Sequence, residues 1–463
     1  MFSTEIYIQR RAKLRKTVKS GLILLPGNDE SPMNYADNGY HFRQDSTFLY
    51  FFGLQHPFLA GILDCDSGDE MIFGNDLTVE DFVWMGPQPT LSKQALQVGV
   101  NKTGDLASLV VLLEEARMKG RKIHFLPPYR PENKIKLFEW LGVPPNEAKM
   151  SASLELIMGV VNQRNYKSAE EIEEIRKACD ISVDMHTLSM RMAKPGVSEA
   201  RIAAAVHEVA LASGGQIAFP IIATINGQTL HNHYHGNILK EGDMFLLDAG
   251  AETAMGYAGD LSSTTPVSGK FTSRQRDIYN ICLDSHNTAI SMLKPGIPFR
   301  EVYFESARVI VRGLKDLGLM KGNVDDALQN GAHAMFFPCG LGHMMGLDVH
   351  DMEDLGEVYV GYGGEPKSTQ FGLKSLRLGR KLEPGFVFTI EPGIYFIPEL
   401  IDQWKATRHN SEYINFDKVE TYRNFGGLRN EENFLVTETG CELLGKPKPK
   451  SIEDVEAEWA KGM

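Results

Sequence analysis

Two stretches of the chain share one pattern, a short and mostly apolar run that ends in an acidic residue. Met244 to Leu247 precede Asp248, and Phe386 to Ile390 precede Glu391. Runs of this length, bounded by glycine, indicate buried strands. A carboxylate at the end of a buried strand is costly unless a partner compensates its charge. The two acids therefore indicate a site that holds a cation or shares a proton.

The same order of motifs occurs twice. Lys194-Pro195-Gly196 precedes a helical pattern over residues 202–212, and Lys294-Pro295-Gly296 precedes another over residues 302–314. Each half then supplies one of the strands that end in an acid. Two motifs repeated in the same order indicate an internal duplication. The sequence thus predicts a pseudo-two-fold pair of α+β halves whose acids converge near the axis.

The residues before this repeat alternate between strand and helix patterns. Apolar runs at 22–25 and 123–126 predict strands, and the spacing of apolar residues over 106–113 predicts an amphipathic helix with Asp105 as its N-cap. Ser168 and Glu171 form a capping box that opens a later helix. We therefore predict a smaller α/β N-terminal domain over 1–160 and an α+β domain over 161–463.

Composition narrows the possible partners. The formal net charge of −12 over 463 residues argues against nucleic acid and anionic membranes, since both favour a basic face. No apolar run approaches the ~20 residues that a bilayer requires, and no signal peptide is visible. The five cysteines are scattered and form no CxxC pair, which favours a reducing compartment. We therefore expect a cytoplasmic protein.

Three further positions complete a set of metal ligands. Asp260 follows a turn-rich passage, where a returning strand would bring it beside Asp248. His343 ends the compact loop Gly340-Leu341-Gly342, and Glu431 precedes the apolar run 434–436. Together with Glu391 these residues offer two Asp, one His and two Glu. Such ligands suit Mn, Co or Zn in a two-metal site with open positions for water.

The order of these five residues, and the sequence around them, resembles the Xaa-Pro peptidases of the pita-bread family, prolidase and aminopeptidase P. The matching stretches are Leu-Leu-Asp-Ala-Gly, Gly-Leu-Gly-His and Ile-Glu-Pro-Gly-Ile-Tyr, with Phe42 to Ser46 and Trp84-Met85-Gly86 in the N-terminal domain. The resemblance implies a creatinase/aminopeptidase-like pita-bread catalytic domain. It also implies a metallopeptidase that hydrolyses the bond between an N-terminal residue and a following proline.

The resemblance assigns a role to each acid and to the histidine. Asp248 would bind one metal, and Asp260 and Glu431 would bridge both. His343 and Glu391 would hold the second metal, and Glu391 would also shuttle a proton. The implied cofactor is a pair of divalent ions, with Mn favoured and Co or Zn as alternatives.

Four more residues match substrate-contacting or supporting positions of the family. His231 and His350 would contact the substrate and act in catalysis, although a solvated loop histidine is the plain alternative for His231. Arg429 would orient an acid ligand through a bidentate pair. Tyr395 would lie near the metals. One departure from the family is Cys339, which stands where a second histidine is common and either weakens substrate positioning or merely packs.

Arg377 bears on substrate length. The stretch 372–377 is similar to one in prolidases, whose matching arginine receives the carboxylate of a dipeptide. The alternative is a surface arginine among Lys374, Arg380 and Lys381. The resemblance thus favours an Xaa-Pro dipeptidase and leaves open an Xaa-Pro aminopeptidase that acts on longer peptides.

Other functions on the same fold also stay open. They are a catalytically inactive binding protein, a metal-independent hydrolase like the creatinases, and a methionine aminopeptidase. The intact set of five ligands argues against the first two, and the large N-terminal domain argues against the third. A homodimer is implied by the resemblance alone.

Overall fold

The computed structural model describes residues 1–462, which form two compact units. The first unit comprises Met1–Arg164 and the short segment Met352–Tyr359. The second comprises Asn165–Asp351 and the residues from Val360 onward. The domain boundary predicted after residue 160 stays a prediction. No helix among the described residues has the length and apolar character needed to cross a bilayer.

The first unit is built on a five-stranded sheet of order β4-β3-β2-β1-β5. The strands are β1 (Leu22–Pro26), β2 (Ala60–Asp64), β3 (Glu70–Phe73), β4 (Lys102–Gly104) and β5 (Ile123–His124). The strand predicted at 22–25 is confirmed as β1. The strand predicted at 123–126 is shorter, because the chain leaves the sheet at Phe125, whose carbonyl accepts from the Ser153 N–H over 3.0 Å.

Seven helices accompany this sheet: α1 (Thr4–Val18), α2 (Ser46–Phe52), α3 (Val79–Met85), α4 (Leu91–Gln97), α5 (Leu106–Met118), α6 (Pro131–Leu141) and α7 (Leu154–Arg164). The predicted amphipathic helix is confirmed as α5, and its N-cap Asp105 accepts from the Ser108 N–H over 2.7 Å. The segment 352–359 adds the 3₁₀ turn η2 (Glu353–Leu355) and most of α13 (Glu357–Val360).

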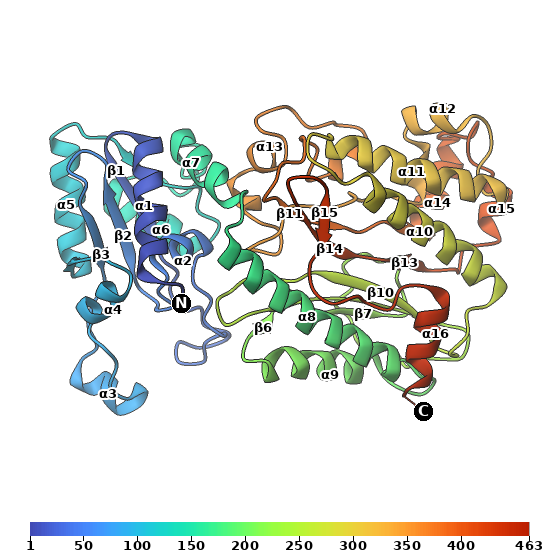
Figure 1. Cartoon of the computed structure of the whole chain (residues 1–463), viewed down its shortest axis with the longest axis horizontal. Helices are drawn as coiled ribbons and strands as arrows, with labels where there is room; N and C mark the ends of the chain where they lie inside the picture. Colours follow the sequence, from blue (N-terminus) through green and yellow to red (C-terminus); the bar gives the residue numbers. More distant parts are fainter. Residues whose placement is uncertain (463) are drawn as a thin grey trace. The chain divides into compact units, whose positions relative to one another are not determined.

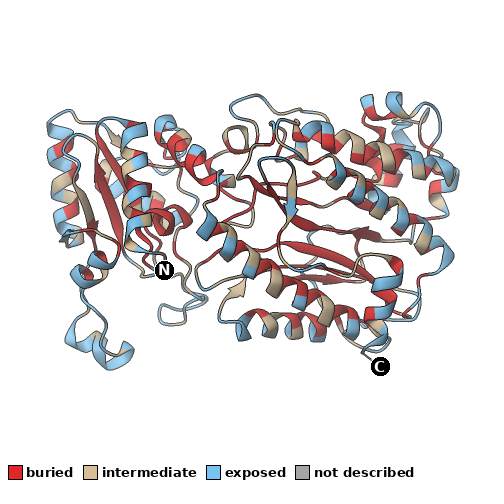
Figure 2. Cartoon of the chain, viewed as in Figure 1, coloured by how far each residue is buried: buried red, intermediate tan, exposed pale blue. Residues whose placement is uncertain are grey.

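The strands of the second unit form small sheets of order β10-β8-β7, β11-β14-β15, β12-β13 and β6-β9. Their bounds are β6 (Gln216–Ile217), β7 (Ile222–Thr224), β8 (Met244–Ala249), β9 (Ala251–Glu252), β10 (Leu261–Pro266), β11 (Val387–Ile390), β12 (Gly393–Tyr395), β13 (Gly427–Arg429), β14 (Glu432–Val436) and β15 (Cys441–Leu443). Most of these strands are buried (Figure 2), although β6 and β15 are partly exposed. Asp248 in β8, Arg429 in β13 and Glu432 in β14 therefore lie in the interior.

Helices cover these sheets on their outer faces (Figure 1). They are α8 (Ala169–Met192), α9 (Glu199–Ala212), α10 (Ser273–Met292), α11 (Phe299–Asp316), α12 (Val324–Gln329), α14 (Pro398–Thr407), α15 (Phe416–Glu420) and α16 (Ile452–Ala460), with 3₁₀ turns η1 (Ala332–Met335) and η3 (Leu373–Ser375). The capping box predicted at Ser168 and Glu171 opens α8.

The two Lys-Pro-Gly motifs of the predicted internal repeat make matching backbone hydrogen bonds. The Gly196 N–H donates to the Leu239 carbonyl and the Gly296 N–H to the Leu382 carbonyl, both over 2.8 Å. The two glycines have φ angles of +87° and +86°, which suit glycine because it lacks a Cβ. A helix pair follows the same plan in each half, α8 with α9 and α10 with α11. The two halves thus bring β8 and β11, with their terminal acids, into one interior.

Candidate metal centre

A cavity of about 320 Å³ in the second unit collects nine of the ten residues selected from the sequence. These nine are His231, Asp248, Asp260, His343, His350, Arg377, Glu391, Arg429 and Glu431. Tyr395 does not line the cavity. It is fully buried behind Arg429, whose Nη1 donates to its hydroxyl over 2.8 Å.

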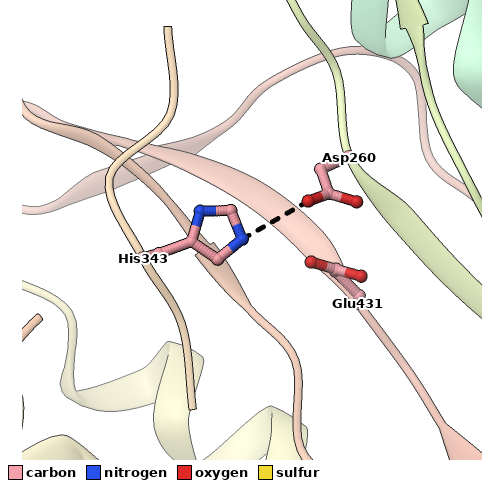
Figure 3. A group of neighbouring side chains, drawn as sticks. All are labelled: Asp260, His343 and Glu431. Carbon is pink, nitrogen blue, oxygen red and sulfur yellow. Dashed lines mark ion pairs between the residues drawn. The ribbon is translucent and has the colours of Figure 1, made fainter. Parts of the chain in front are cut away.

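Asp260, His343 and Glu431 form the centre of this group (Figure 3). One oxygen or nitrogen from each lies within 4.8 Å of the others. His343 Nε2 is 3.3 Å from Asp260 Oδ2 and 3.6 Å from Glu391 Oε1. His343 Nδ1 lies 3.1 Å from the Met344 carbonyl, and since a carbonyl only accepts, Nδ1 carries the proton. Nε2, the other ring nitrogen, faces the carboxylates of Asp260 and Glu391.

The electrostatics of this group favour a cation. Burial raises the pKa of Asp260 and of Glu431 well above the usual range, and the mutual repulsion of the acids raises both further. Asp260 Oδ1 and Glu431 Oε1 are buried and have no hydrogen-bond partner. Buried carboxylate oxygens without donors, next to an imidazole nitrogen, are the arrangement that divalent metal ions satisfy. The residues present therefore fit divalent metal ions.

Arg429 supports the group differently from the prediction. We expected a bidentate pair with one acid ligand, but only Nη2 contacts Asp248, at 2.5 Å from Oδ2. The other two nitrogens contact Tyr395 and, through Nε over 2.8 Å, the Ser262 hydroxyl. The fork is divided because Asp248, Ser262 and Tyr395 lie on three different strands around the guanidinium. Arg429 thus joins three strands instead of clamping one carboxylate.

The histidines selected from the sequence lie at the cavity wall. The rings of His343 and His350 are 4.1 Å apart between centroids, in an edge-to-face arrangement. Burial lowers the pKa of His231, although the nearby Asp248 opposes the shift. Its imidazole is therefore neutral at neutral pH and offers one N–H to a bound molecule.

Cys339 also lines the cavity. Burial raises the pKa of its thiol to about 12, and Glu391 raises it further, while Arg429 opposes the shift. A protonated thiol is a weak hydrogen-bond donor and a poor nucleophile. The structure therefore places Cys339 in the wall of the cavity as a protonated thiol.

Several residues of the site were not selected from the sequence. The Ser262 hydroxyl donates to Glu431 Oε2 over 2.7 Å while it accepts from Arg429. An apolar wall is formed by Phe219, Ile222 and Leu230. The period of two along a strand was an available signal for Ser262, which stands two residues after Asp260 and so points to the same side. The apolar wall carries no such signal, because apolar residues occur in every strand.

Comparison with known proteins agrees with this geometry. The sequence model of metallopeptidase family M24 matches residues 173–438, and that of the aminopeptidase P N-terminal domain matches residues 7–124. The Xaa-Pro dipeptidase of Homo sapiens is 30% identical over 96% of this chain and 90% of its own length. The Xaa-Pro aminopeptidase of Escherichia coli (strain K12) is 32% identical over 98% of this chain and 97% of its own length.

Among solved structures, aminopeptidase PepP of Pseudomonas aeruginosa superposes with a TM-score of 0.82 at 27% identity, covering 100% of this chain and 99% of that chain. The predicted α+β pita-bread catalytic domain with a smaller α/β N-terminal domain is thereby confirmed. The family match spans more than half of the chain and contains every candidate ligand. The chain belongs to metallopeptidase family M24 and carries an N-terminal domain of the aminopeptidase P type.

Proposed function

We propose that this protein is a proline-specific metallopeptidase that hydrolyses the bond between an N-terminal residue and a following proline. The observation that carries the proposal is the convergence of Asp248, Asp260, His343, Glu391 and Glu431 on one cavity. The relatives named as Xaa-Pro dipeptidase and Xaa-Pro aminopeptidase support the choice of substrate. Proline needs a specialist because its amide has no N–H and its φ is restricted.

The five converging residues would hold two divalent metal ions, for which we propose Mn, with Co and Zn as alternatives. Asp248 would bind one ion, Asp260 and Glu431 would bridge both, and His343 and Glu391 would hold the second. When bound, the ions supply a water of lowered pKa and polarise the substrate carbonyl.

The remaining steps belong to side chains of the chain. Glu391 has a side chain that is 19% exposed, and its Oε1 accepts from the Thr389 hydroxyl over 3.3 Å. We assign to it the transfer of a proton from the attacking water to the leaving proline nitrogen. His231 and His350 would donate to the substrate and stabilise the oxyanion as it forms. Tyr395 would act by holding Arg429, because it does not reach the cavity.

Arg377 and Ser375 line the same cavity as the acids, which supports a role for Arg377 in substrate binding. We propose that the Arg377 guanidinium receives the terminal carboxylate of a dipeptide, as a charge-assisted pair. The activity favoured is therefore that of an Xaa-Pro dipeptidase. The alternative is an Xaa-Pro aminopeptidase, in which Arg377 would contact the chain of a longer peptide.

We further propose a homodimer in the cytoplasm. In α3 no residue is buried, and the Trp84 side chain is 82% exposed. Clustered exposed apolar side chains mark interaction surfaces, and we propose that a second copy of the chain covers those of α3. The five cysteines form no disulfide among residues 1–462, as suits a reducing compartment.

The test is hydrolysis of Ala-Pro and Ala-Pro-Ala side by side, on protein stripped by a chelator and then restored with Mn. Cleavage of the dipeptide alone supports the dipeptidase, and comparable cleavage of the tripeptide supports the aminopeptidase. Met-Ala serves as the control substrate for a methionine aminopeptidase. Absence of metal-restored cleavage of either proline peptide would overturn the proposal.

A further inference from the structure

A second row of residues lies directly behind the acids. Glu391 follows β11 and Glu431 precedes β14, and these two strands pair in an antiparallel register. Thr389 and Asn433 stand two residues from those acids, so their side chains point to the same side of the sheet. They are cross-strand partners of one another, and both are fully buried. The pair therefore forms the next row beneath the cavity.

The Asn433 side chain binds the backbone of Asp260 at both of its polar groups. Its Nδ2 donates to the Asp260 carbonyl over 2.6 Å, and its Oδ1 accepts from the Asp260 N–H over 3.0 Å. Asp260 lies just before β10 and has no place in a sheet ladder. The side-chain amide of Asn433 supplies the two hydrogen bonds that a neighbouring strand would otherwise make to the Asp260 backbone. It fixes the main chain from which the Asp260 carboxylate extends.

Thr389 contacts the other two ligands. Its hydroxyl accepts from the His343 N–H over 3.2 Å and donates to Glu391 Oε1 over 3.3 Å. The Thr389 N–H also donates to the His343 carbonyl over 3.0 Å. One side chain thus ties the backbone of His343 to the carboxylate of Glu391.

We propose that Thr389 and Asn433 are positioning residues that align four of the five candidate ligands of the metal centre. Asn433 holds Asp260, and Thr389 holds His343 and Glu391. The fourth ligand, Glu431, immediately precedes β14, the strand that carries Asn433. The inference rests on the proposed metal centre. Ligand sets tolerate displacements of only about 0.5 Å, and loss of such supporting hydrogen bonds costs about 10- to 100-fold in metal affinity or activity.

The experiment measures Mn²⁺ binding by calorimetry to the full-length, chelator-stripped protein, together with the melting temperature of each metal-free variant. Asn433→Leu removes the amide and Thr389→Val removes the hydroxyl, each without a change in the number of side-chain heavy atoms. Thr389→Ser restores the hydroxyl. Cys179→Ala is the matched control, because the Cys179 thiol also donates to Asn433 Oδ1, over 3.0 Å, but contacts none of the candidate ligands.

We expect Asn433→Leu and Thr389→Val to weaken Mn²⁺ binding by about 10- to 100-fold. Thr389→Ser and Cys179→Ala should stay within about twofold of the wild type, since both keep the contacts to the ligands. The Thr389 variants decide the question if Asn433→Leu fails to fold. Unchanged affinity in Thr389→Val, with wild-type protein binding Mn²⁺ normally, would overturn this inference alone. Wild-type protein that binds no Mn²⁺ would overturn the proposed metal centre as well.

Discussion

Arg429 Nη2 lies 2.5 Å from Asp248 Oδ2, in the interior between two strands that are distant in the sequence. Asp248 belongs to β8 of the first half, and Arg429 ends β13 of the second. The pair therefore joins the two halves at the cavity itself. Since both side chains are nearly buried, water and salt screen the interaction only weakly. Loss of this ion pair should therefore disturb the candidate metal centre.

The first prediction concerns this pair. Arg429→Lys keeps the positive charge but lacks the planar fork, so it cannot reach Asp248, Ser262 and Tyr395 together. We expect kcat/KM for Ala-Pro to fall by about 10- to 100-fold. Tyr395→Phe removes one acceptor of the fork and serves as the milder control. A lysine variant with wild-type kcat/KM would contradict this account of Arg429.

Arg377 is predicted to act only on substrates with a carboxylate next to the proline. Arg377→Met should lower kcat/KM for Ala-Pro by about 10- to 100-fold, the loss expected for one hydrogen bond to a charged group. Ala-Pro-amide, which lacks that carboxylate, should be cleaved equally by both proteins. Arg380→Met is the matched control, because Arg380 pairs with Glu383 over 2.8 Å and does not line the cavity. Equal losses on both substrates would argue against Arg377 as the carboxylate receptor.

Metal binding is predicted to stabilise the folded chain. Asp260 Oδ1 and Glu431 Oε1 are buried without donors, and a bound cation compensates them in the native state only. At a concentration 100-fold above Kd, a metal that binds only the native state adds about 2.7 kcal/mol. For a unit of about 300 residues, with an unfolding entropy of about 0.6 kcal/mol/K, we expect the melting temperature to rise by about 4 °C. Thermal unfolding with chelator and with Mn measures the rise, which His343→Asn should reduce strongly.

A buried ion pair supports the loop that carries His350. Lys167 Nζ lies 2.9 Å from Asp351 Oδ2, and both side chains are 1% exposed. Lys167→Met should lower the free energy of unfolding by about 3–5 kcal/mol, because it leaves a buried carboxylate without its cation. The double variant with Asp351→Leu should lose less than the two single variants together. Additive losses in urea unfolding would show that the pair does not act as a unit.

In the first unit, the ion pair of Asp64 with Arg121 makes the free energy of unfolding depend on pH in the acid range. Burial alone would raise the pKa of Asp64, but hydrogen bonds from Arg121 and from two backbone N–H groups outweigh it, so the pKa is lowered. A lowered folded-state pKa contributes stability above the unfolded pKa of about 3.9, and that stability is lost as the pH falls through the folded-state value.

Asp64→Asn should therefore lower the free energy of unfolding near pH 7 by about 1–3 kcal/mol. The difference between variant and wild type should shrink as the pH falls below about 4, where Asp64 becomes protonated in the unfolded chain, and should be lost once the pH passes the lower folded-state pKa. Urea unfolding at both pH values measures it. Asp66→Asn is the control, since the Asp66 side chain pairs with the same arginine but is 46% exposed. A pH-independent difference would contradict the assignment.

Much of the site could be predicted before the structure. Asp248 and Glu391 are evident because each ends an apolar run, and the structure places them at the ends of β8 and β11. The repeat of Lys-Pro-Gly motifs predicted two halves, which the matching hydrogen bonds of Gly196 and Gly296 confirm. These features are local: strand length, the period of two and the conformational freedom of glycine act on neighbouring residues.

The tertiary structure decided how the distant segments meet. Asn433 binds Asp260, which lies 173 residues earlier in the sequence. Ser262 contacts Glu431 and Arg429, which lie 169 and 167 residues later in the sequence. Neither residue type stands out, because a serine or an asparagine on a strand is most often solvated or part of a turn. The prediction of a bidentate pair between Arg429 and one acid was also wrong, because the guanidinium divides its contacts among three strands. By itself the sequence determined which residues are candidates for the chemistry. Which side chains hold them in place depends on long-range packing, which brings donors and acceptors together in three dimensions. The period of two along a strand indicates the side to which a residue points, but it does not indicate the distant partner.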